Sequence, residues 1–178
     1  MKIDNKHERS FNVPVDSVRD ILDTLSRPND QLWPRDNWPP MLLDANLKQG
    51  AKGGHGPVRY YVDEYVPGRR AIFRFDGTGL TAGLDGRHYF EIIARNNHNV
   101  LRHVVDAECD LGAWLKWKLL IEPLHDALLE DALDRVEKTL EGRVSRPARW
   151  NPWVRFVRRI MVKKRQRAEQ AAKHQGSS

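Results

Sequence analysis

The chain has 178 residues, of which 40% are hydrophobic and 30% are charged. This composition is typical of a globular protein, and the length favours one domain with an appendage. Cys109 is the only cysteine, which excludes an internal disulfide and a metal cluster built on thiolates. No segment reaches the roughly 18 uninterrupted apolar residues that a membrane-spanning helix needs.

The net charge of +6 is unevenly distributed along the chain. The segment from Gly142 onward holds 11 of the 30 basic residues and one of the 24 acidic residues, so it carries +10 and leaves −4 for the rest. The body is therefore mildly acidic, and a nucleic-acid partner is not expected.

The first residues, Met1–Glu8, lack the apolar core of a secretory signal. The single cysteine is also compatible with a reducing compartment. We therefore expect a cytoplasmic protein, with peripheral membrane association as a possibility that the basic tail raises.

Lys2–Val13 has the mixed polarity of a strand at the edge of a sheet. Val18, Ile21, Leu22 and Leu25 then follow at helical spacing, which predicts a short amphipathic helix. The two elements together predict a strand followed directly by a helix.

Leu32–Pro40 contains three prolines, which forbid a continuous helix or a central strand. It also contains Trp33 and Trp38. These two side chains either plug an edge of the core or form part of a pocket mouth.

Five later segments have the alternation or apolar content of strands, and antiparallel strands joined by short turns commonly keep one face on the core. The segments are Met41–Gln49, Val58–Val66, Arg70–Asp76, Arg87–Arg95 and Asn99–Asp110. The glycine-rich run Gly50–Pro57 is interpreted as the turn between the first two, because it matches no phosphate-binding motif.

A long amphipathic helix is predicted from Pro123 to Leu140, with Gly142 as its stop. The preceding segment, Leu111–Ile121, fits either a first helical segment or a terminal strand, and helix is favoured. The charged side chains of the long helix are predicted to face outward, away from its apolar stripe. They are Asp126, Glu130, Asp134, Glu137 and Lys138.

This order of segments resembles the START-like superfamily, also called SRPBCC or helix-grip, which includes polyketide cyclases, pollen allergens and lipid-transfer domains. The resemblance is carried by Phe11–Val18, which leads from the first strand into the first helix, and by the closing helix from Pro123. It implies an α+β fold in which a curved antiparallel sheet grips the long helix around a cavity. The expected domains are 1–142 and a basic helical extension, 143–178, that is partly disordered at its end.

A ligand cavity needs an apolar lining with a few polar groups. On the inward faces of the predicted strands and helix, the candidate ligand-binding residues are Tyr60, His88, Phe90, His103, Trp117, His125 and Leu128. Aromatic side chains at such spacing are usually part of an ordinary core, and a histidine among apolar residues is more often hydrogen-bonded to a neighbour than catalytic. No His-Glu-x-x-His pair and no Gly-x-Ser-x-Gly elbow is present, and Asp126 is expected to point away from its neighbour His125. No metal ion and no cofactor are therefore expected.

The tail predicts a basic amphipathic helix after Pro152. Such a helix can lie on an anionic membrane surface, contact a protein partner or pack on the body. The residues expected to make a membrane or partner contact are Trp153, Arg155, Phe156, Arg158, Arg159 and Lys163.

Two functions of different kinds follow from these features. The first is the binding of an apolar or amphipathic small molecule, such as a lipid or a polyketide. The alternative is an enzyme of the cyclase or hydratase kind that uses a cavity histidine for proton transfer.

Overall fold

The structure, a computed structural model, describes the backbone of residues 1–175 and the side chains of residues 1–163. Within this range, seven strands form one antiparallel sheet in the order β1-β7-β6-β5-β4-β3-β2. The strands are β1 (Lys2–Phe11), β2 (Met41–Leu43), β3 (Lys52–His55), β4 (Val58–Val66), β5 (Arg70–Phe75), β6 (Leu84–Ala94) and β7 (Asn99–Cys109). The edge position predicted for the first strand is confirmed.

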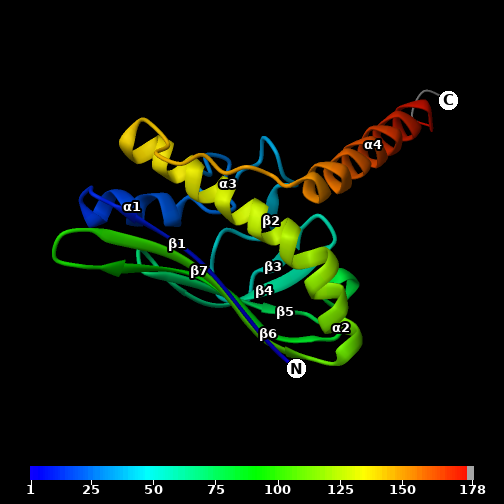
Figure 1. Ribbon diagram of the computed structural model, residues 1–178, viewed down its shortest axis with the longest axis horizontal. Coiled ribbons are helices and arrows are strands. Elements are labelled where there is room, and N and C mark those ends of the chain that lie inside the picture. The colour runs from blue at the N-terminus through cyan, green and yellow to red at the C-terminus, as the bar shows by residue number, and fades with distance from the viewer. Residues whose placement is uncertain (176–178) are drawn as a thin grey trace. The chain divides into compact units, whose positions relative to one another are not determined.

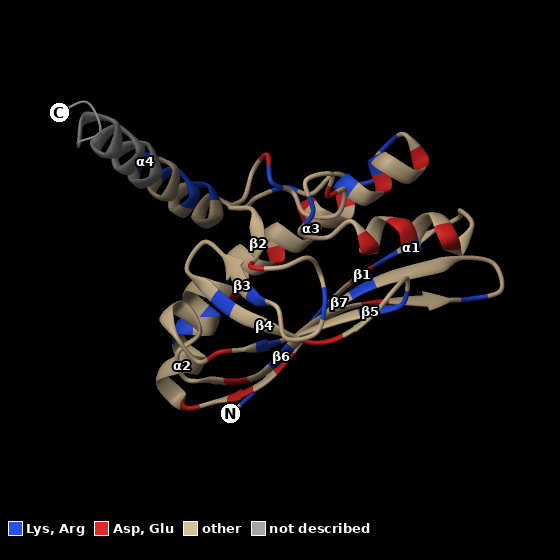
Figure 2. Cartoon of the chain, turned by 180° about the vertical axis from the view of Figure 1, so that it is seen from behind, with Lys and Arg blue, Asp and Glu red and all other residues tan. Residues whose placement is uncertain are grey.

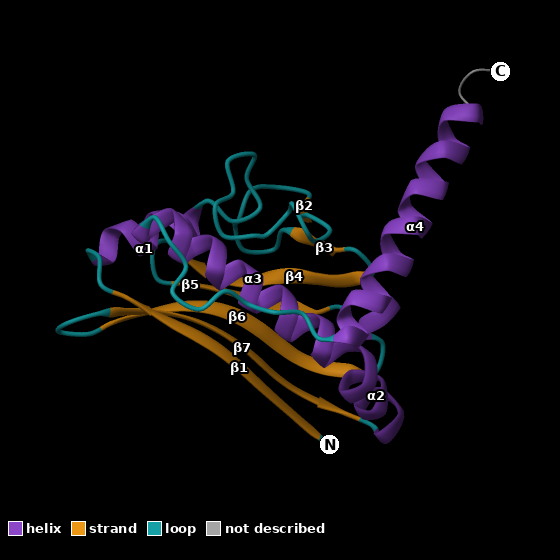
Figure 3. Ribbon diagram, turned by 45° about the horizontal axis from the view of Figure 1, so that its top comes forward, coloured by secondary structure: helices purple, strands orange, loops and turns teal. Residues whose placement is uncertain are grey.

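The sheet twists, and two helices lie across one of its faces (Figures 1 and 3). The helical elements are α1 (Val15–Asp23), the short 3₁₀ turn η1 (Gly79–Thr81), α2 (Leu111–Lys116), the π-helical turn η2 (Trp117–Ile121), α3 (Glu122–Glu141) and α4 (Pro152–Gln175). The helices on the sheet are α1 and α3, which also contact one another. This arrangement confirms the α+β helix-grip architecture.

The chain is continuously helical from α2 through η2 to α3. Leu111–Ile121 is therefore a helical segment and not a strand. Gly142 ends α3 in the left-handed conformation, with φ of 74° and its N–H donating to the Lys138 carbonyl. The stop predicted at this glycine is confirmed.

Two predictions about the far edge of the sheet are wrong. The strand expected over Met41–Gln49 ends at Leu43, and the expected glycine-rich turn contains strand β3. A Cβ atom at Gly53 would lie 1.9 Å from the Leu42 carbonyl oxygen. The glycines of this run therefore permit the close approach of neighbouring strands. In the sequence, such a run of glycines looks the same as a turn.

Trp33 and Trp38 are buried, which fits the interpretation that they plug the edge of the core. The Trp33 indole donates to the Pro39 carbonyl at 2.8 Å. The Trp38 indole donates to Asp131 Oδ2 of α3, also at 2.8 Å. Each indole thus places its ring in the core and gives its N–H a partner.

The acidic side of α3 was predicted to face solvent, and this prediction is wrong. Its carboxylates pair with side chains of β1. Alternate residues of β1, Asn5, His7 and Arg9, point toward it across the gap between strand and helix. Asn5 Nδ2 donates to Asp126 Oδ1 at 2.9 Å, and His7 Nδ1 lies 2.7 Å from Glu130 Oε1. The red positions along α3 in Figure 2 therefore include partners of the edge strand.

Arg9 makes the densest of these contacts. Its guanidinium donates to Asp134, to Glu137 Oε2 at 2.8 Å and to Glu130 Oε2 at 3.0 Å. Burial opposes its charge, but the hydrogen bond and the negative charge of Asp134 outweigh burial, so the pKa of Arg9 is raised. The side chains of Arg9, Asp134 and Glu137 are 17%, 17% and 8% exposed, so these three are shielded from water, whereas Glu130, at 38%, lies at the margin.

Internal contacts divide the chain into two units, Met1–Ala148 and Arg149–Ser178. The second unit contains α4, whose backbone is helical to Gln175. Disorder is expected after Arg167, but the backbone is helical to Gln175, and residues 176–178 lie outside the described residues. Among the described helices, none combines the length and the hydropathy needed to cross a bilayer.

Replacing Arg9 with Gln leaves Asp134 and Glu137 without their cation, whereas Glu130 keeps its contact with His7. We expect the free energy of unfolding to fall by about 3–5 kcal/mol, the usual cost of breaking a shielded ion pair on one side. Urea unfolding of the wild type and the variant at neutral pH measures this change in the free energy of unfolding.

The matched control is Arg102→Gln on the neighbouring strand β7. Arg102 also contacts two carboxylates, Glu8 at 2.8 Å and Glu91 at 3.3 Å. Glu8 is 41% exposed, so this loss should cost less than about 1 kcal/mol. Equal losses in the two variants would contradict the structural role assigned to Arg9.

Candidate functional site

The seven predicted ligand-binding residues come together between the inner face of the sheet and the α2–η2–α3 helix. Those that are buried are Tyr60, His88, Phe90, His103, Trp117 and Leu128. His125, in the first turns of α3, is half-buried. The strand alternation that led to these choices therefore placed the side chains on the inner face.

The aromatic and imidazole rings of this group contact one another in series. The distances between ring centroids are 4.8 Å for Tyr60–His88, 5.5 Å for His88–His103, 4.6 Å for Phe90–His103, 5.1 Å for His103–His125 and 5.7 Å for Trp117–His125. These are ordinary contact distances for packed rings. Along this line the space between sheet and helix, expected to be hollow, is occupied by side chains. We call these six residues the ring cluster.

His55 belongs beside the ring cluster, although the sequence analysis did not select it. Its Nδ1 lies 3.0 Å from the Tyr60 hydroxyl, and its ring is 4.8 Å from that of Trp33. It was overlooked because it lies in the glycine-rich run that was interpreted as a turn. The only signal available was the histidine itself.

Several polar atoms of the ring cluster have no hydrogen-bond partner. His88 Nδ1 and His103 Nε2 face one another at 3.3 Å. In the part of the chain that the structure describes, the buried ring nitrogens left without a hydrogen bond are His88 Nε2, His103 Nδ1, Trp117 Nε1 and His125 Nδ1. Each such atom costs about 1–3 kcal/mol when it is shut away from water. A site this polar is unusual for an ordinary core.

The imidazoles of this interior are held neutral. Burial lowers the pKa of His55 to about 3. Burial, reinforced by neighbouring imidazoles, holds the pKa of His88 and of His103 well below 6.5. Burial also lowers the pKa of His125, and the neighbouring Asp126 offsets part of this decrease. A neutral imidazole carries one donor and one acceptor, so the ring cluster can bind either kind of polar group.

His7 behaves in the opposite way at the rim of the same interior. Its Nε2 lies 3.0 Å from Asp126 Oδ1, and its Nδ1 lies 2.7 Å from Glu130 Oε1. Burial opposes a positive charge there, but the bonds to Asp126 and Glu130 raise the pKa of His7 to about 9. Asp126 Oδ1 also lies 3.9 Å from His125 Nδ1. The prediction that Asp126 points away from His125 is therefore wrong.

Three of these groups could hold a metal ion. One ligand atom from each of His7, His125 and Asp126 lies within 4.8 Å of the others. The sequence analysis missed this group because His7 lies on the first strand, 119 residues before Asp126. No motif of local spacing connects the two positions.

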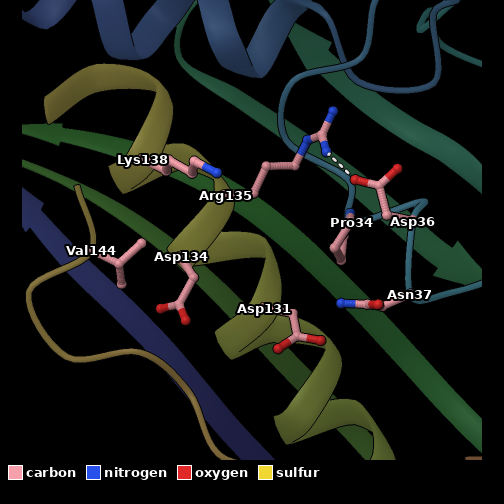
Figure 4. A pocket seen from close by; sticks show the side chains of 8 residues that line it. All are labelled: Pro34, Asp36, Asn37, Asp131, Asp134, Arg135, Lys138 and Val144. Atoms are coloured by element: carbon pink, nitrogen blue, oxygen red, sulfur yellow. Dashed lines mark hydrogen bonds and ion pairs between the residues drawn. The ribbon is translucent and has the colours of Figure 1, made fainter. Parts of the chain in front are cut away.

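A separate pocket of about 270 Å³ lies on another face of α3. The residues that line it are Pro34, Asp36, Asn37, Asp131, Asp134, Arg135, Lys138 and Val144 (Figure 4). Arg135 Nη1 donates to Asp36 Oδ2 at 3.0 Å across it. The predicted ligand-binding residues do not line this pocket, and its mixed charges do not match an apolar ligand.

All six predicted contact residues of the tail lie on α4, whose described part carries the blue basic positions of Figure 2. The apolar side chains of Trp153 and Phe156 are 46% and 55% exposed, and their rings lie 6.1 Å apart. Ile160 is 40% exposed at the same helical face. Exposed apolar side chains thus alternate with basic ones around the helix.

No family model and no curated protein matches this sequence. Solved structures do. A protein from Thermobifida fusca is 11% identical with a TM-score of 0.60, covering 83% of this chain and 99% of its own. CalU16 from Micromonospora echinospora is 15% identical with a TM-score of 0.54, covering 88% and 81%. Norcoclaurine synthase from Thalictrum flavum is 12% identical with a TM-score of 0.60, covering 79% and 95%. At this identity the likeness concerns the fold alone, and the fold that the chain shares with these structures is the helix-grip fold.

Proposed function

We propose that this protein binds a small molecule with an apolar body and a few oxygen atoms, of the lipid or polyketide kind, against the ring cluster between the sheet and α3. The observation that carries the proposal is the group of four buried ring nitrogens without hydrogen bonds. A carbonyl or hydroxyl oxygen of a ligand would pair with them and remove the cost of leaving them unpaired.

The surroundings of these nitrogens suit the apolar part of such a molecule. Phe90 on β6 and Leu128 on α3 are buried apolar side chains. Trp117 lies at the start of the π-helical turn η2, just before His125. Turns of this kind are uncommon and occur frequently at functional sites, because they reshape a helix locally.

The fold is compatible with this role. One structure of norcoclaurine synthase from Thalictrum flavum, 10% identical with a TM-score of 0.59, is a complex with a transition-state analogue. A protein of the same fold therefore binds a small molecule. The chemistry proposed for the present chain rests on its own histidines and aromatic residues.

Filling the interior should prevent binding. In Leu128→Trp, the larger side chain adds bulk at a buried position of α3. We expect the affinity for the amphipathic fluorophore anilinonaphthalene sulfonate to fall by about tenfold or more, equivalent to about 1.4 kcal/mol. Fluorescence titration measures it, and circular dichroism checks the fold.

Leu119→Trp is the matched control, because Leu119 is 69% exposed on η2. It should bind the fluorophore like the wild type. Unchanged affinity in Leu128→Trp would contradict the proposed location. Native mass spectrometry of protein purified from its own host would then show whether any apolar molecule accompanies the chain.

An enzyme of the cyclase or hydratase kind is the second candidate. It is favoured by the facing pair His88 and His103, whose nitrogens at 3.3 Å can pass a proton between them. In His103→Gln, we expect any conversion of the co-purifying molecule to slow by about 10²–10⁴-fold while its binding persists. Conversion by the variant at the wild-type rate would contradict the enzymatic reading.

For the tail, we infer that α4 associates with an anionic membrane surface. Trp153, Phe156 and Ile160 offer exposed apolar surface, and Arg155, Arg159 and Lys163 supply exposed positive charge on the same helix. An apolar strip bordered by bases suits the boundary between headgroups and acyl chains. Each base contributes about 1 kcal/mol near such a surface.

Vesicle sedimentation tests this inference. Vesicles with phosphatidylserine should bind the protein, vesicles of phosphatidylcholine alone should not, and salt should weaken the interaction. Arg155→Gln should weaken it about fivefold. Phe156→Ser should weaken it too, whereas Leu42→Ser, at a 62% exposed apolar residue of β2, should not. Equal binding to both vesicle types would exclude anionic docking.

A further inference from the structure

His7, Asp126 and His125 present two imidazole nitrogens and a carboxylate oxygen to one small volume at the rim of the interior. The three side chains are half-buried, and their ligand atoms lie within 4.8 Å of one another. The measured approaches are 3.0 Å from His7 Nε2 to Asp126 Oδ1 and 3.9 Å from His125 Nδ1 to the same oxygen. Ligands around a tetrahedral zinc ion are about 3.4 Å apart, so these separations require only small adjustments.

We propose that His7, His125 and Asp126 form a binding site for one divalent transition-metal ion of the zinc type. Two imidazoles with one carboxylate form a donor set suited to such ions. Three protein ligands leave a further coordination position open, as in zinc sites that act on a substrate or on water. This site shares His125 with the ring cluster, but its metal binding can be tested in the absence of any small molecule.

The surroundings of His7 match those of a metal-binding histidine. Its second nitrogen, Nδ1, is 2.7 Å from Glu130 Oε1, and Glu130 in turn accepts from Arg9 at 3.0 Å. A carboxylate on the far nitrogen fixes the orientation of the ring and directs its other nitrogen toward the metal. Asn5 steadies Asp126 by a hydrogen bond of 2.9 Å.

A purely structural ion pair between His7 and the carboxylates would leave part of this arrangement without a purpose. His125 Nδ1 is buried, is directed toward Asp126 and makes no hydrogen bond within the described residues. Asn5 Oδ1, beside the same carboxylate, is also buried and without a hydrogen bond there. A metal ion bound between the three side chains uses the lone pair of His125 and explains its direction.

The position of the site connects it with the interior. The His125 ring contacts the rings of His103 and Trp117, with centroids 5.1 Å and 5.7 Å away. An ion held by His125 would therefore lie next to the ring cluster. Its open coordination position would be available to an oxygen atom of a bound molecule or to water, whose acidity the ion would increase.

The test is titration of the full chain, freed of metal by a chelator, with Zn²⁺ and Co²⁺ alone. We expect one ion per chain by calorimetry, and a Co²⁺ visible spectrum of low coordination number. Glu130→Gln, which removes the support of His7, should weaken binding about 10–100-fold. His7→Gln, His125→Gln and Asp126→Asn should each weaken it further.

The matched control is His98→Gln, in the turn between β6 and β7, which should bind Zn²⁺ like the wild type. Circular dichroism shows whether each variant remains folded, and His125→Gln is the most informative because His125 Nδ1 makes no hydrogen bond within the described residues. The proposal is overturned if the wild type shows no saturable binding of either ion. It is equally overturned if folded His125→Gln binds Zn²⁺ as the wild type does.

Discussion

The contact of Arg9 with three carboxylates determines how the long helix lies on the sheet. Glu130, Asp134 and Glu137 occur at helical spacing on one side of α3, and the edge strand β1 meets them with a guanidinium. This contact sets the rotation of α3 about its axis. The residues beside the acidic ones, including His125 and Leu128, are consequently directed toward the inner face of the sheet. The arrangement of the interior thus depends on charges at its margin.

The interior that results is unusual in its histidine content. Five of the seven histidines of the chain, His7, His55, His88, His103 and His125, lie in or beside it. The deeper ones are neutral because burial disfavours their charge, whereas His7 is charged because two carboxylates accompany it. Groups that differ in protonation over so short a distance are typical of functional sites and uncommon in ordinary cores.

The fold by itself does not account for these features. Helix-grip proteins with 11–15% identity to the chain share its architecture, but at that identity the likeness does not extend to side chains. The proposals therefore rest on the unpaired nitrogens of the ring cluster, on the ligand group of His7, His125 and Asp126, and on the exposed apolar strip of α4. The first two share His125, whereas the third concerns a separate part of the chain, and each is tested by its own experiment.

Sequence alone determined the order of the elements other than β3. Strand alternation in β4, β6 and β7 and the apolar stripe of α3 are local patterns that can be recognised without tertiary information. It also selected all six members of the ring cluster, four of them from strand alternation, which shows which residues share a face. Only the tertiary structure decided what lies opposite that face. The acidic side of α3 was assigned to solvent because helical periodicity does not reveal that β1 covers it. His7 and Asp126 are in contact although 119 residues separate them in the sequence. His55 lies on strand β3, whose glycines are also typical of a turn. Such pairings depend on how distant segments dock, which no local spacing records.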